Sequence, residues 1–302
     1  SKALRVETDQ GQRFVSYEAA IVATGSKSAL PKAFDLGNPR VMTSRDALEL
    51  EDIPEQLLVG GGGYIGMELS TVYSALGSQV VVVEALDSVL LGADADLVRP
   101  VLARAKKAFK EIRLKTQVSK MATSGKQIKV EMEFEGRKRE ELYDRVLVAV
   151  GRVPNCGDLG LENTKVTRDD KGFIKVNEKL QTSDPMIYAI GDVVGGALLA
   201  HKASREARTA IEVICGELSL VEKVVIPAVV FTDPELAWCG LTEAEAKQKG
   251  IPVKVAKFPW AASGRALTLD RTDGVTKLVI DPESERILGV GIVGHGAGEL
   301  IA

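Results

Sequence analysis

The sequence predicts an α/β fold, in which a parallel sheet carries a glycine turn, followed by a smaller α+β domain. The first observation is the glycine-rich turn at residues 60–66, with an apolar strand before it and a helical pattern after it. The second is Val80–Val83, a continuous β-branched run that is typical of a strand buried on both faces of a parallel sheet. The third is the alternation of short strands with a helix after residue 226. These features indicate a Rossmann-like unit and a separate domain that starts near residue 223.

The glycine turn has the residue types that a dinucleotide pyrophosphate requires. Residues 61–66 read Gly-Gly-Gly-Tyr-Ile-Gly, which matches the G-x-G-x-x-G pattern. Gly61 permits the tight turn, Gly63 allows the backbone to approach the pyrophosphate, and Gly66 allows the helix to pack closely on the strand. The pyrophosphate then binds the free N–H groups at the positive end of the helix.

Glu84 indicates which dinucleotide binds. It follows the buried strand, 18 residues after Gly66, where an acid can bind the ribose hydroxyls. The alternative is a solvated glutamate that merely ends a buried strand. A 2′-phosphate would be repelled by this carboxylate, and no Lys or Arg occurs from Ala85 to Val98. The sequence therefore favours NAD over NADP.

The spacing of apolar residues predicts the remaining elements. In the helix after the turn, the inward face is predicted to carry Ile65, Leu69, Val72 and Leu76. A second helix is predicted to start near Asp94, because acids favour a helix N-terminus. The other predicted elements are a hairpin in residues 1–20, strands at 21–24, 112–115, 127–134, 142–149, 173–176 and 187–190, a helix ending at Gly216, a strand at 227–231, a helix at 242–249 and strands at 253–258, 275–280 and 287–293.

Composition excludes several classes of protein. A net charge of −3 without a basic patch gives no footprint for nucleic acid. No stretch approaches the roughly 20 apolar residues that span a bilayer, so no membrane association is expected. Cys156, Cys215 and Cys239 lack C-x-x-C spacing and indicate reduced thiols in a cytoplasmic protein. His201 and His295 have no partner at metal or triad spacing, so each reads as a surface or packing histidine and no metal site is expected.

Both ends of the sequence read as cut. There is no initiator Met, and residues 298–302 read as a helix that has barely begun. Such a short element cannot bury its own face. The expectation is that the chain is a fragment lacking both ends.

Four motifs occur in a fixed order: Ala23–Ser26, Gly61–Glu68, Gly151–Asn155 and Tyr188–Asp192. In this order they resemble the FAD-dependent pyridine nucleotide-disulfide oxidoreductases, in which an NAD(P) domain is inserted into an FAD domain. Further segments similar to this family are residues 199–203, 226–235, 258–266 and 296–301. The resemblance implies the end of the first part of an FAD domain at 1–30, an NAD-binding domain at 31–152, the returning part of the FAD domain at 153–222 and a truncated α+β interface (dimerisation) domain at 223–302.

The resemblance also implies roles for individual residues. The residues predicted to bind FAD are Thr24, Gly25, Ser26, Asp192, Leu198, Leu199, Ala200 and His201. Those predicted to bind NAD are Gly61, Gly62, Gly63, Tyr64, Ile65, Gly66, Met67, Glu68, Glu84, Val118 and Gly151. Tyr64 is either a gate of the nicotinamide pocket or a residue that packs on its helix. Glu68 alone could be an exposed helix residue, and Asp192 alone could be a helix N-cap.

The activity that the resemblance implies is electron transfer from dihydrolipoamide through a redox disulfide and FAD to NAD. A homodimer is implied, with lipoyl domains or other components of 2-oxo-acid dehydrogenase complexes as partners. In the family, the redox cysteine pair and the acid–base histidine belong to segments outside this sequence, so no catalytic residue is assigned and the chain alone is expected to be inactive. Two alternatives stay open: a soluble transhydrogenase or other disulfide reductase of the same fold, and a non-catalytic NAD-binding or dimerisation module.

Overall fold

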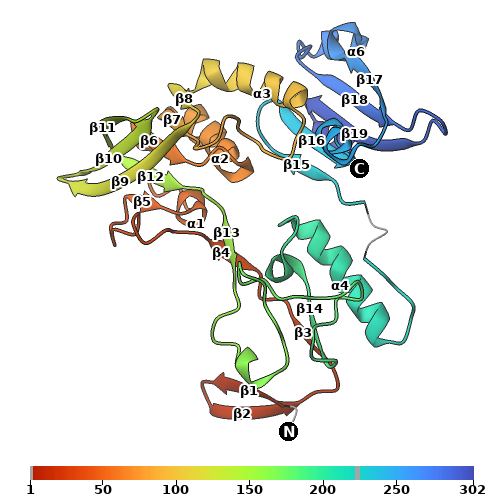
Figure 1. Ribbon diagram of the computed structural model, residues 1–302. Coiled ribbons are helices and arrows are strands. Elements are labelled where there is room, and N and C mark those ends of the chain that lie inside the picture. The colour runs from red at the N-terminus through yellow and green to blue at the C-terminus, as the bar shows by residue number, and fades with distance from the viewer. Residues whose placement is uncertain (1–2, 222–224) are drawn as a thin grey trace. The chain divides into compact units, whose positions relative to one another are not determined.

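The computed structural model describes residues 3–221 and 225–302. Two compact units make up the chain (Figure 1). The first unit combines Ser1–Lys27 with Arg152–Ile226, and the second combines Ser28–Gly151 with Pro227–Ala302. The chain therefore leaves the first unit, builds most of the second, returns to the first and finally re-enters the second.

A parallel sheet of five strands forms the centre of the second unit. Its strands, in spatial order, are β5 (Val41–Met42), β12 (Arg145–Val148), β6 (Gln56–Gly60), β7 (Gln79–Val83) and β8 (Glu111–Arg113). Every adjacent pair is parallel. The run Val80–Val83 in β7 is buried, as its β-branched composition predicts. This confirms the α/β class.

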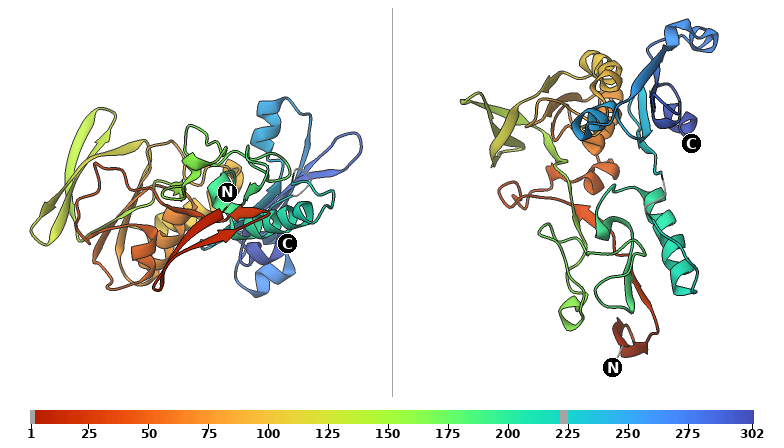
Figure 2. Two further views of the ribbon diagram at one scale, coloured as in Figure 1. Left: turned by 90° about the horizontal axis from the view of Figure 1, so that it is seen from below. Right: turned by 45° about the vertical axis from the view of Figure 1, so that its right-hand side comes forward.

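The two faces of this sheet have different covers. The helices α1 (Ser44–Leu48), α2 (Tyr64–Ala75) and α3 (Ala95–Ala108) accompany one face, where alternate residues of β6 and β7 pack with α2 and α3 in one core. The other face packs against an antiparallel sheet of β9 (Thr116–Ser124), β10 (Gln127–Phe134) and β11 (Arg137–Tyr143). Figure 2 shows the long yellow-green strands of that sheet.

Two sequence predictions for this region need correction. The buried face of α2 does not carry Val72 and Leu76, which are 43% and 48% exposed. The buried residues of α2 are Gly66, Met67, Leu69, Ser70 and Tyr73. Two of these residues, Gly66 and Ser70, are not apolar, so apolar spacing does not mark the face that is buried. The sequence also missed most of β9 and β11, because β11 is mostly exposed and charged and shows no apolar alternation.

The elements of the first unit are short, except for the fifteen-residue helix α4. They are β1 (Ala3–Thr8), β2 (Gly11–Ser16), β3 (Ala20–Val22), β4 (Ser26–Ser28), β13 (Arg152–Pro154), η1 (Leu161–Asn163), β14 (Ile187–Ala189), η2 (Gly191–Val194) and α4 (Ala200–Ile214). β1 and β2 form the predicted hairpin, and β3 pairs in parallel with β14. The strand predicted at 173–176 is wrong: Ile174 makes only an isolated bridge with Arg168. Isolated apolar residues there fill the core without a neighbouring strand to pair with.

An antiparallel sheet completes the second unit. Its order is β15 (Ala228–Val230), β16 (Glu235–Gly240), β19 (Ile287–Gly294), β18 (Val275–Ile280) and β17 (Lys254–Pro259). Four short helices accompany it: α5 (Glu243–Lys249), η3 (Trp260–Ala262), α6 (Gly264–Thr268) and α7 (Ala297–Leu300). Sequence reasoning missed β16, because its six residues show no alternation of apolar and polar side chains. α3 packs against β16 and β19, and the two regions share one core.

Within the described ranges, no helix is both long enough and apolar enough to cross a membrane.

Candidate nucleotide-binding sites

The glycine turn joins β6 to α2 at a place where two of its positions exclude any side chain. Gly61 has a φ of +111°, and a Cβ atom there would lie 2.4 Å from the Ala149 carbonyl oxygen. A Cβ atom on Gly66 would lie 2.0 Å from the Gly61 carbonyl oxygen. Both obstacles are backbone atoms, so they cannot move aside as a side chain could. The turn can therefore form without a shift of the backbone only with glycine at these two positions.

Gly63 has the opposite environment. It is exposed and is the N-cap of the twelve-residue helix α2, and a Cβ atom added to it would meet no protein atom within 4 Å. The first N–H groups of a helix have no partner within the helix and lie at its positive end. The open side of the turn at Gly63 thus fits a dinucleotide pyrophosphate, whose approach a side chain would obstruct.

The Glu84 carboxylate is fixed against this turn. Its Oε2 accepts a hydrogen bond from the Gly62 N–H at 2.7 Å, and its Oε1 accepts one from the Leu86 N–H at 2.9 Å. A carboxylate has about four acceptor sites, so both oxygens keep capacity for ribose hydroxyls. The fixed orientation supports the prediction that Glu84 binds the ribose, in preference to a merely solvated glutamate.

Basic residues near Glu84 bear on the choice between NAD and NADP. Arg113, on the neighbouring strand β8, donates to Glu111 at 2.6 Å and to Glu141 at 3.0 Å, so its charge is already paired. The Lys115 N–H donates to the Leu86 carbonyl oxygen at 2.8 Å. This bond places the backbone of a lysine beside the segment that follows Glu84. Lys115 lies outside the range from Ala85 to Val98, because it follows the next strand, β8. The preference for NAD stays a prediction.

Glu68 is not a simple exposed glutamate. It is half-buried on α2, and its Oε1 accepts a hydrogen bond from the Phe231 N–H at 2.8 Å. Burial raises the pKa of Glu68, and the hydrogen bond opposes that rise. The structure therefore joins the glycine-turn helix to the segment after β15, two stretches that the sequence singled out separately. Tyr64, one helical turn before Glu68, is 37% exposed, and its gating role stays a prediction.

The other residues predicted to bind NAD differ in exposure. Val118 is half-buried on β9 and packs against the core beneath the antiparallel sheet. Gly151 is exposed with a φ of +128° and has no protein atom within 4 Å of an added Cβ. Ile65 is half-buried, whereas Met67 is fully buried in the core. Because the Met67 side chain is buried in the core, only the Met67 backbone could contact a cofactor.

In the first unit, the first and third sequence motifs meet. The Thr24 hydroxyl donates to the Asn155 carbonyl oxygen at 2.7 Å, and the Asn155 side chain donates to the Thr24 carbonyl oxygen at 3.0 Å. The Asn155 N–H donates to the Gly25 carbonyl oxygen at 2.9 Å. These reciprocal bonds fix the turn in which the chain departs from this unit.

Asp192 lies at the same turn, in η2 after β14. The Ser26 hydroxyl donates to its Oδ2 at 2.5 Å, and Arg152 Nε donates to the Ser26 hydroxyl at 2.7 Å. Arg152 Nε also lies 3.8 Å from Asp192 Oδ2. Arg152 was not among the predicted site residues, although it stands in the third motif directly after a glycine. Asp192 and Ser26, which were both predicted to bind FAD, are joined by this hydrogen bond.

A buried ion pair supports the turn that carries Asp192. The Glu206 side chain accepts a hydrogen bond from the Gly191 N–H at 2.6 Å and pairs with Lys202 Nζ at 2.7 Å. Both charged groups are nearly buried, at 5% and 12% exposed. Sequence reasoning missed Glu206, because a glutamate within a helix gives no sign of burial.

Residues 198–201 form the N-terminus of α4. Leu198 and Leu199 are half-buried, Leu199 is the N-cap, and Ala200 and His201 are exposed. No acidic residue occurs in the first turn of this fifteen-residue helix, so its positive end is not compensated by its own side chains. An anionic group of a cofactor fits there.

Two features together define a class of protein. Along the chain, a strand–glycine turn–helix unit, in which Glu84 is fixed against the turn, is inserted between two parts of another unit, in which Asp192 follows the parallel strand β14. This organisation is typical of α/β oxidoreductases that bind dinucleotides.

Comparison with known families agrees with this class. Residues 1–207 match the model of the pyridine nucleotide-disulphide oxidoreductase family, and residues 226–302 match the model of its dimerisation domain. The chain belongs to the pyridine nucleotide-disulphide oxidoreductase family, which confirms the resemblance seen in its motifs.

Curated relatives extend this result. The chain is 45% identical to a dihydrolipoyl dehydrogenase of Vibrio parahaemolyticus over 302 residues, covering 99% of this chain and 63% of the relative. It is 44% identical to a dihydrolipoyl dehydrogenase of Haloferax volcanii over 295 residues, covering 97% of this chain and 62% of the relative. The chain thus spans somewhat less than two thirds of these relatives.

Solved structures share the fold. The HOCl-induced flavoprotein disulfide reductase RclA of Escherichia coli superposes with a TM-score of 0.88 at 28% identity, covering 99% of this chain and 68% of that structure. LpdA of Mycobacterium tuberculosis superposes with a TM-score of 0.89 at 27% identity, covering 98% of this chain and 64% of that structure.

Proposed function

We propose that this chain is the nucleotide-handling part of a dihydrolipoamide dehydrogenase. The parent enzyme would pass electrons from dihydrolipoamide through a redox disulfide and FAD to NAD. The Glu84 carboxylate, held 2.7 Å from the Gly62 N–H beside an open glycine turn, carries the NAD part of this proposal. Identity of 44–45% with dihydrolipoyl dehydrogenases over almost the whole chain supports the choice of reaction.

The chain's own residues would bind and orient the two cofactors. The N–H groups at the start of α2 would bind the NAD pyrophosphate, and Glu84 would accept hydrogen bonds from the ribose hydroxyls. Asp192, oriented by Ser26 and Arg152, would accept a hydrogen bond from the ribityl chain of FAD. When bound, FAD supplies hydride exchange with the nicotinamide. The positive end of α4 would stabilise negative charge on FAD.

This assignment gives the chain binding roles without a catalytic group of its own. Within the described residues, Cys156, Cys215 and Cys239 are free thiols, and none of them is paired with another. The chain alone is therefore expected to be inactive toward dihydrolipoamide. If the chain is a non-catalytic NAD-binding module, it would bind NAD without turnover.

The parent enzyme would act as a homodimer in the cytoplasm. The dimerisation-domain match at residues 226–302 supports the dimer, and the free thiols suit a reducing compartment. Its partners would be lipoyl domains and other components of 2-oxo-acid dehydrogenase complexes.

Binding of nicotinamide nucleotides tests the NAD site. NADH and NADPH are titrated into the chain and binding is followed by nicotinamide fluorescence, with NADH expected to bind more tightly. Glu84→Ala should weaken NADH binding at least about tenfold, because hydrogen bonds to a charged group contribute about 1.5–3 kcal/mol and each 1.4 kcal/mol is tenfold. Glu55→Ala, an exposed glutamate at the start of the same sheet, is the control and should leave affinity unchanged. Equal affinity for the two nucleotides, or normal binding by Glu84→Ala, would contradict the proposal.

Turnover and gene sequence test the reaction. NADH-dependent reduction of a dye, with and without added FAD, separates a working flavoenzyme from a binding module. Oxidation of dihydrolipoamide by the isolated chain at an ordinary enzymatic rate would refute the assignment of catalytic groups to other segments. In the gene, a close cysteine pair is expected upstream of residue 1 and a His-Pro motif downstream of residue 302. A complete gene without them would refute the choice of reaction.

A further inference from the structure

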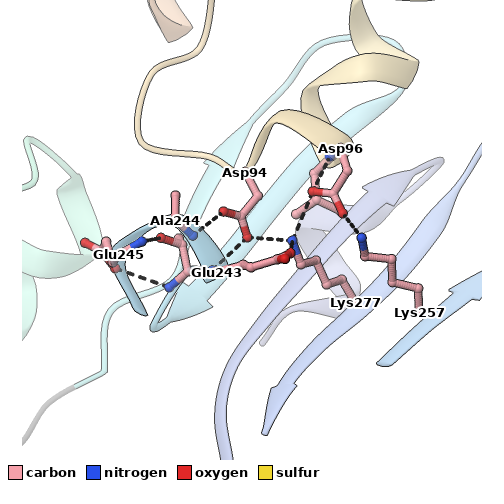
Figure 3. A network of polar contacts seen from close by, with 9 residues as sticks. Asp94, Asp96, Glu243, Ala244, Glu245, Lys257 and Lys277 are labelled. Atoms are coloured by element: carbon pink, nitrogen blue, oxygen red, sulfur yellow. Dashed lines mark hydrogen bonds and ion pairs between the residues drawn. The ribbon is translucent and has the colours of Figure 1, made fainter. Parts of the chain in front are cut away.

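A buried lysine, Lys277, connects α3 to the five-stranded antiparallel sheet that contains β18 (Figure 3). The Lys277 side chain is 1% exposed, and its Nζ lies 2.8 Å from Asp94, 3.0 Å from Asp96 and 2.6 Å from Glu243. At the rim of this group, Lys257 Nζ lies 2.6 Å from Asp96. Two ammonium groups thus face three carboxylates, and one of the ammonium groups is fully removed from water.

The members of this network come from separate elements of the second unit. Asp94 and Asp96 begin α3, Glu243 begins α5, and Lys277 lies in the middle of β18. Asp94 has a further role, because its carboxylate accepts hydrogen bonds from the Glu243 and Ala244 N–H groups, each at 3.0 Å. It therefore caps α5 while it is the N-cap of α3.

The electrostatics of this network resist any displacement of α3. Burial works to lower the pKa of Lys277, but hydrogen bonds to the three carboxylates outweigh burial and raise that pKa above its ordinary value. Lys277 therefore stays charged. A buried charge that loses its partners is strongly destabilising, so the carboxylates of Asp94 and Asp96 must remain at the lysine.

The chain segment just before α3 is part of the dinucleotide site. Segment 84–94 begins at Glu84, which accepts from the Gly62 N–H, and the Leu90 N–H donates to the Gly62 carbonyl oxygen at 2.9 Å. Val89 fills the space beside Gly62, since a Cβ atom there would lie 2.7 Å from Val89 Cγ1. Asp94, the last residue of the segment, is the residue that Lys277 holds. The segment is thus attached to the glycine turn at one end and to the lysine network at the other.

We propose that Lys277 is a positioning residue for NAD. By holding Asp94 and Asp96, it fixes segment 84–94, and thereby Gly62 and Glu84, in the arrangement that binds the ribose and the pyrophosphate. The inference rests on the proposed NAD site. Part of the NAD affinity is thus assigned to the Lys277 side chain in β18. This side chain acts through segment 84–94.

The test compares Lys277→Met with a matched control. Lys247→Met makes the same substitution at an exposed lysine on α5. NADH affinity is measured by fluorescence titration, and hydrogen–deuterium exchange is measured at the Leu86 and Leu90 amides, which hold the segment to Glu84 and Gly62. Lys277→Met should weaken NADH binding about fivefold, within the range for residues that act on a ligand through the structure. It should also speed exchange at both amides, while Lys247→Met changes neither quantity.

Each outcome decides the inference. A folded Lys277→Met protein with wild-type NADH affinity and wild-type exchange at Leu86 and Leu90 refutes it and leaves the NAD site intact. Failure of the wild-type chain to bind NADH refutes the proposed function, and the inference with it. If Lys277→Met does not fold, Glu243→Gln decides by the same two measurements, since it weakens the network and keeps the lysine paired with two aspartates.

Discussion

Replacing Gly66 with alanine places a methyl group 2.0 Å from the Gly61 carbonyl oxygen, 3.1 Å from the Gly61 carbonyl carbon and 3.4 Å from a Val59 methyl group. An ordinary contact distance begins near 3.4 Å, so the start of α2 and the end of β6 would have to separate by about 1.4 Å. The obstacle is the backbone carbonyl group of Gly61. Rotation of a side chain therefore cannot relieve the clash.

Opposing contributions set the size of the effect. Alanine favours the helix over glycine by about 1 kcal/mol. Overpacking costs about 1–3 kcal/mol, and a backbone obstacle places Gly66→Ala at the upper end of that range. The expected net loss in the free energy of unfolding is about 2 kcal/mol. For a unit of about 200 residues, this corresponds to a fall in Tm of about 6 °C.

Gly63→Ala is the matched variant, because it adds the same methyl group to the same turn. Its Cβ meets no protein atom within 4 Å, and the φ of −71° suits alanine, so Tm should stay close to that of the wild type. The methyl group would instead stand where the pyrophosphate approaches, and NADH affinity should fall. Thermal unfolding by circular dichroism and NADH titration measure the two effects. Unchanged stability of Gly66→Ala, or wild-type NADH affinity of Gly63→Ala, would show that the roles of these glycines are wrongly assigned.

Three further predictions concern polar groups that are buried or half-buried. Tyr73→Phe removes the hydroxyl that donates to the buried Ala47 carbonyl oxygen at 2.8 Å, so the free energy of unfolding should fall by about 1–2 kcal/mol in chemical denaturation. Glu206→Ala removes the carboxylate that pairs with the Lys202 ammonium, whose side chain is 12% exposed, and should destabilise the first unit by about 3 kcal/mol. Hydrogen exchange of α4 measures this loss, and unchanged exchange would contradict the prediction. The pKa of Asp96 lies below its ordinary 3.8, because hydrogen bonds from two lysines outweigh the rise due to burial. Its contribution to stability is present above the unfolded pKa and is lost as the pH falls through the lower folded pKa, so Asp96→Asn should flatten the fall of Tm below about pH 4.

Local sequence was sufficient for the features that neighbouring residues determine. The turn at Gly61 and Gly66, the buried strand Val80–Val83 and the start of α3 at Asp94 all form as predicted. In each case the cause lies within a few residues: a positive φ, a β-branched run, or an acid at a helix N-terminus. The acid Glu84 was also found in this way, because its distance from the turn is fixed by one helix and one strand.

The rotation of α2 and the strand β16 needed the folded chain. Apolar spacing placed Val72 and Leu76 inward, yet both are exposed, and the buried face of α2 includes Gly66 and Ser70, which are not apolar. The strand β16 pairs with β15 and β19, and neither pairing leaves a periodic signal in its six residues. The hydrophobic pattern indicates which side chains are buried, but it does not indicate which surface they pack against.

The sequence by itself determined the glycine turn, the acid Glu84 that accepts a hydrogen bond from it, and the order of motifs that marks the family. Only the tertiary structure decided which distant charges meet. Lys277 lies in an alternating strand where a lysine reads as solvent-facing, yet it shares the buried face with Val279 and pairs with Asp94. Arg152 likewise reaches Ser26 across more than a hundred residues. Such contacts depend on how separate elements pack, and local backbone preference carries no information about that packing.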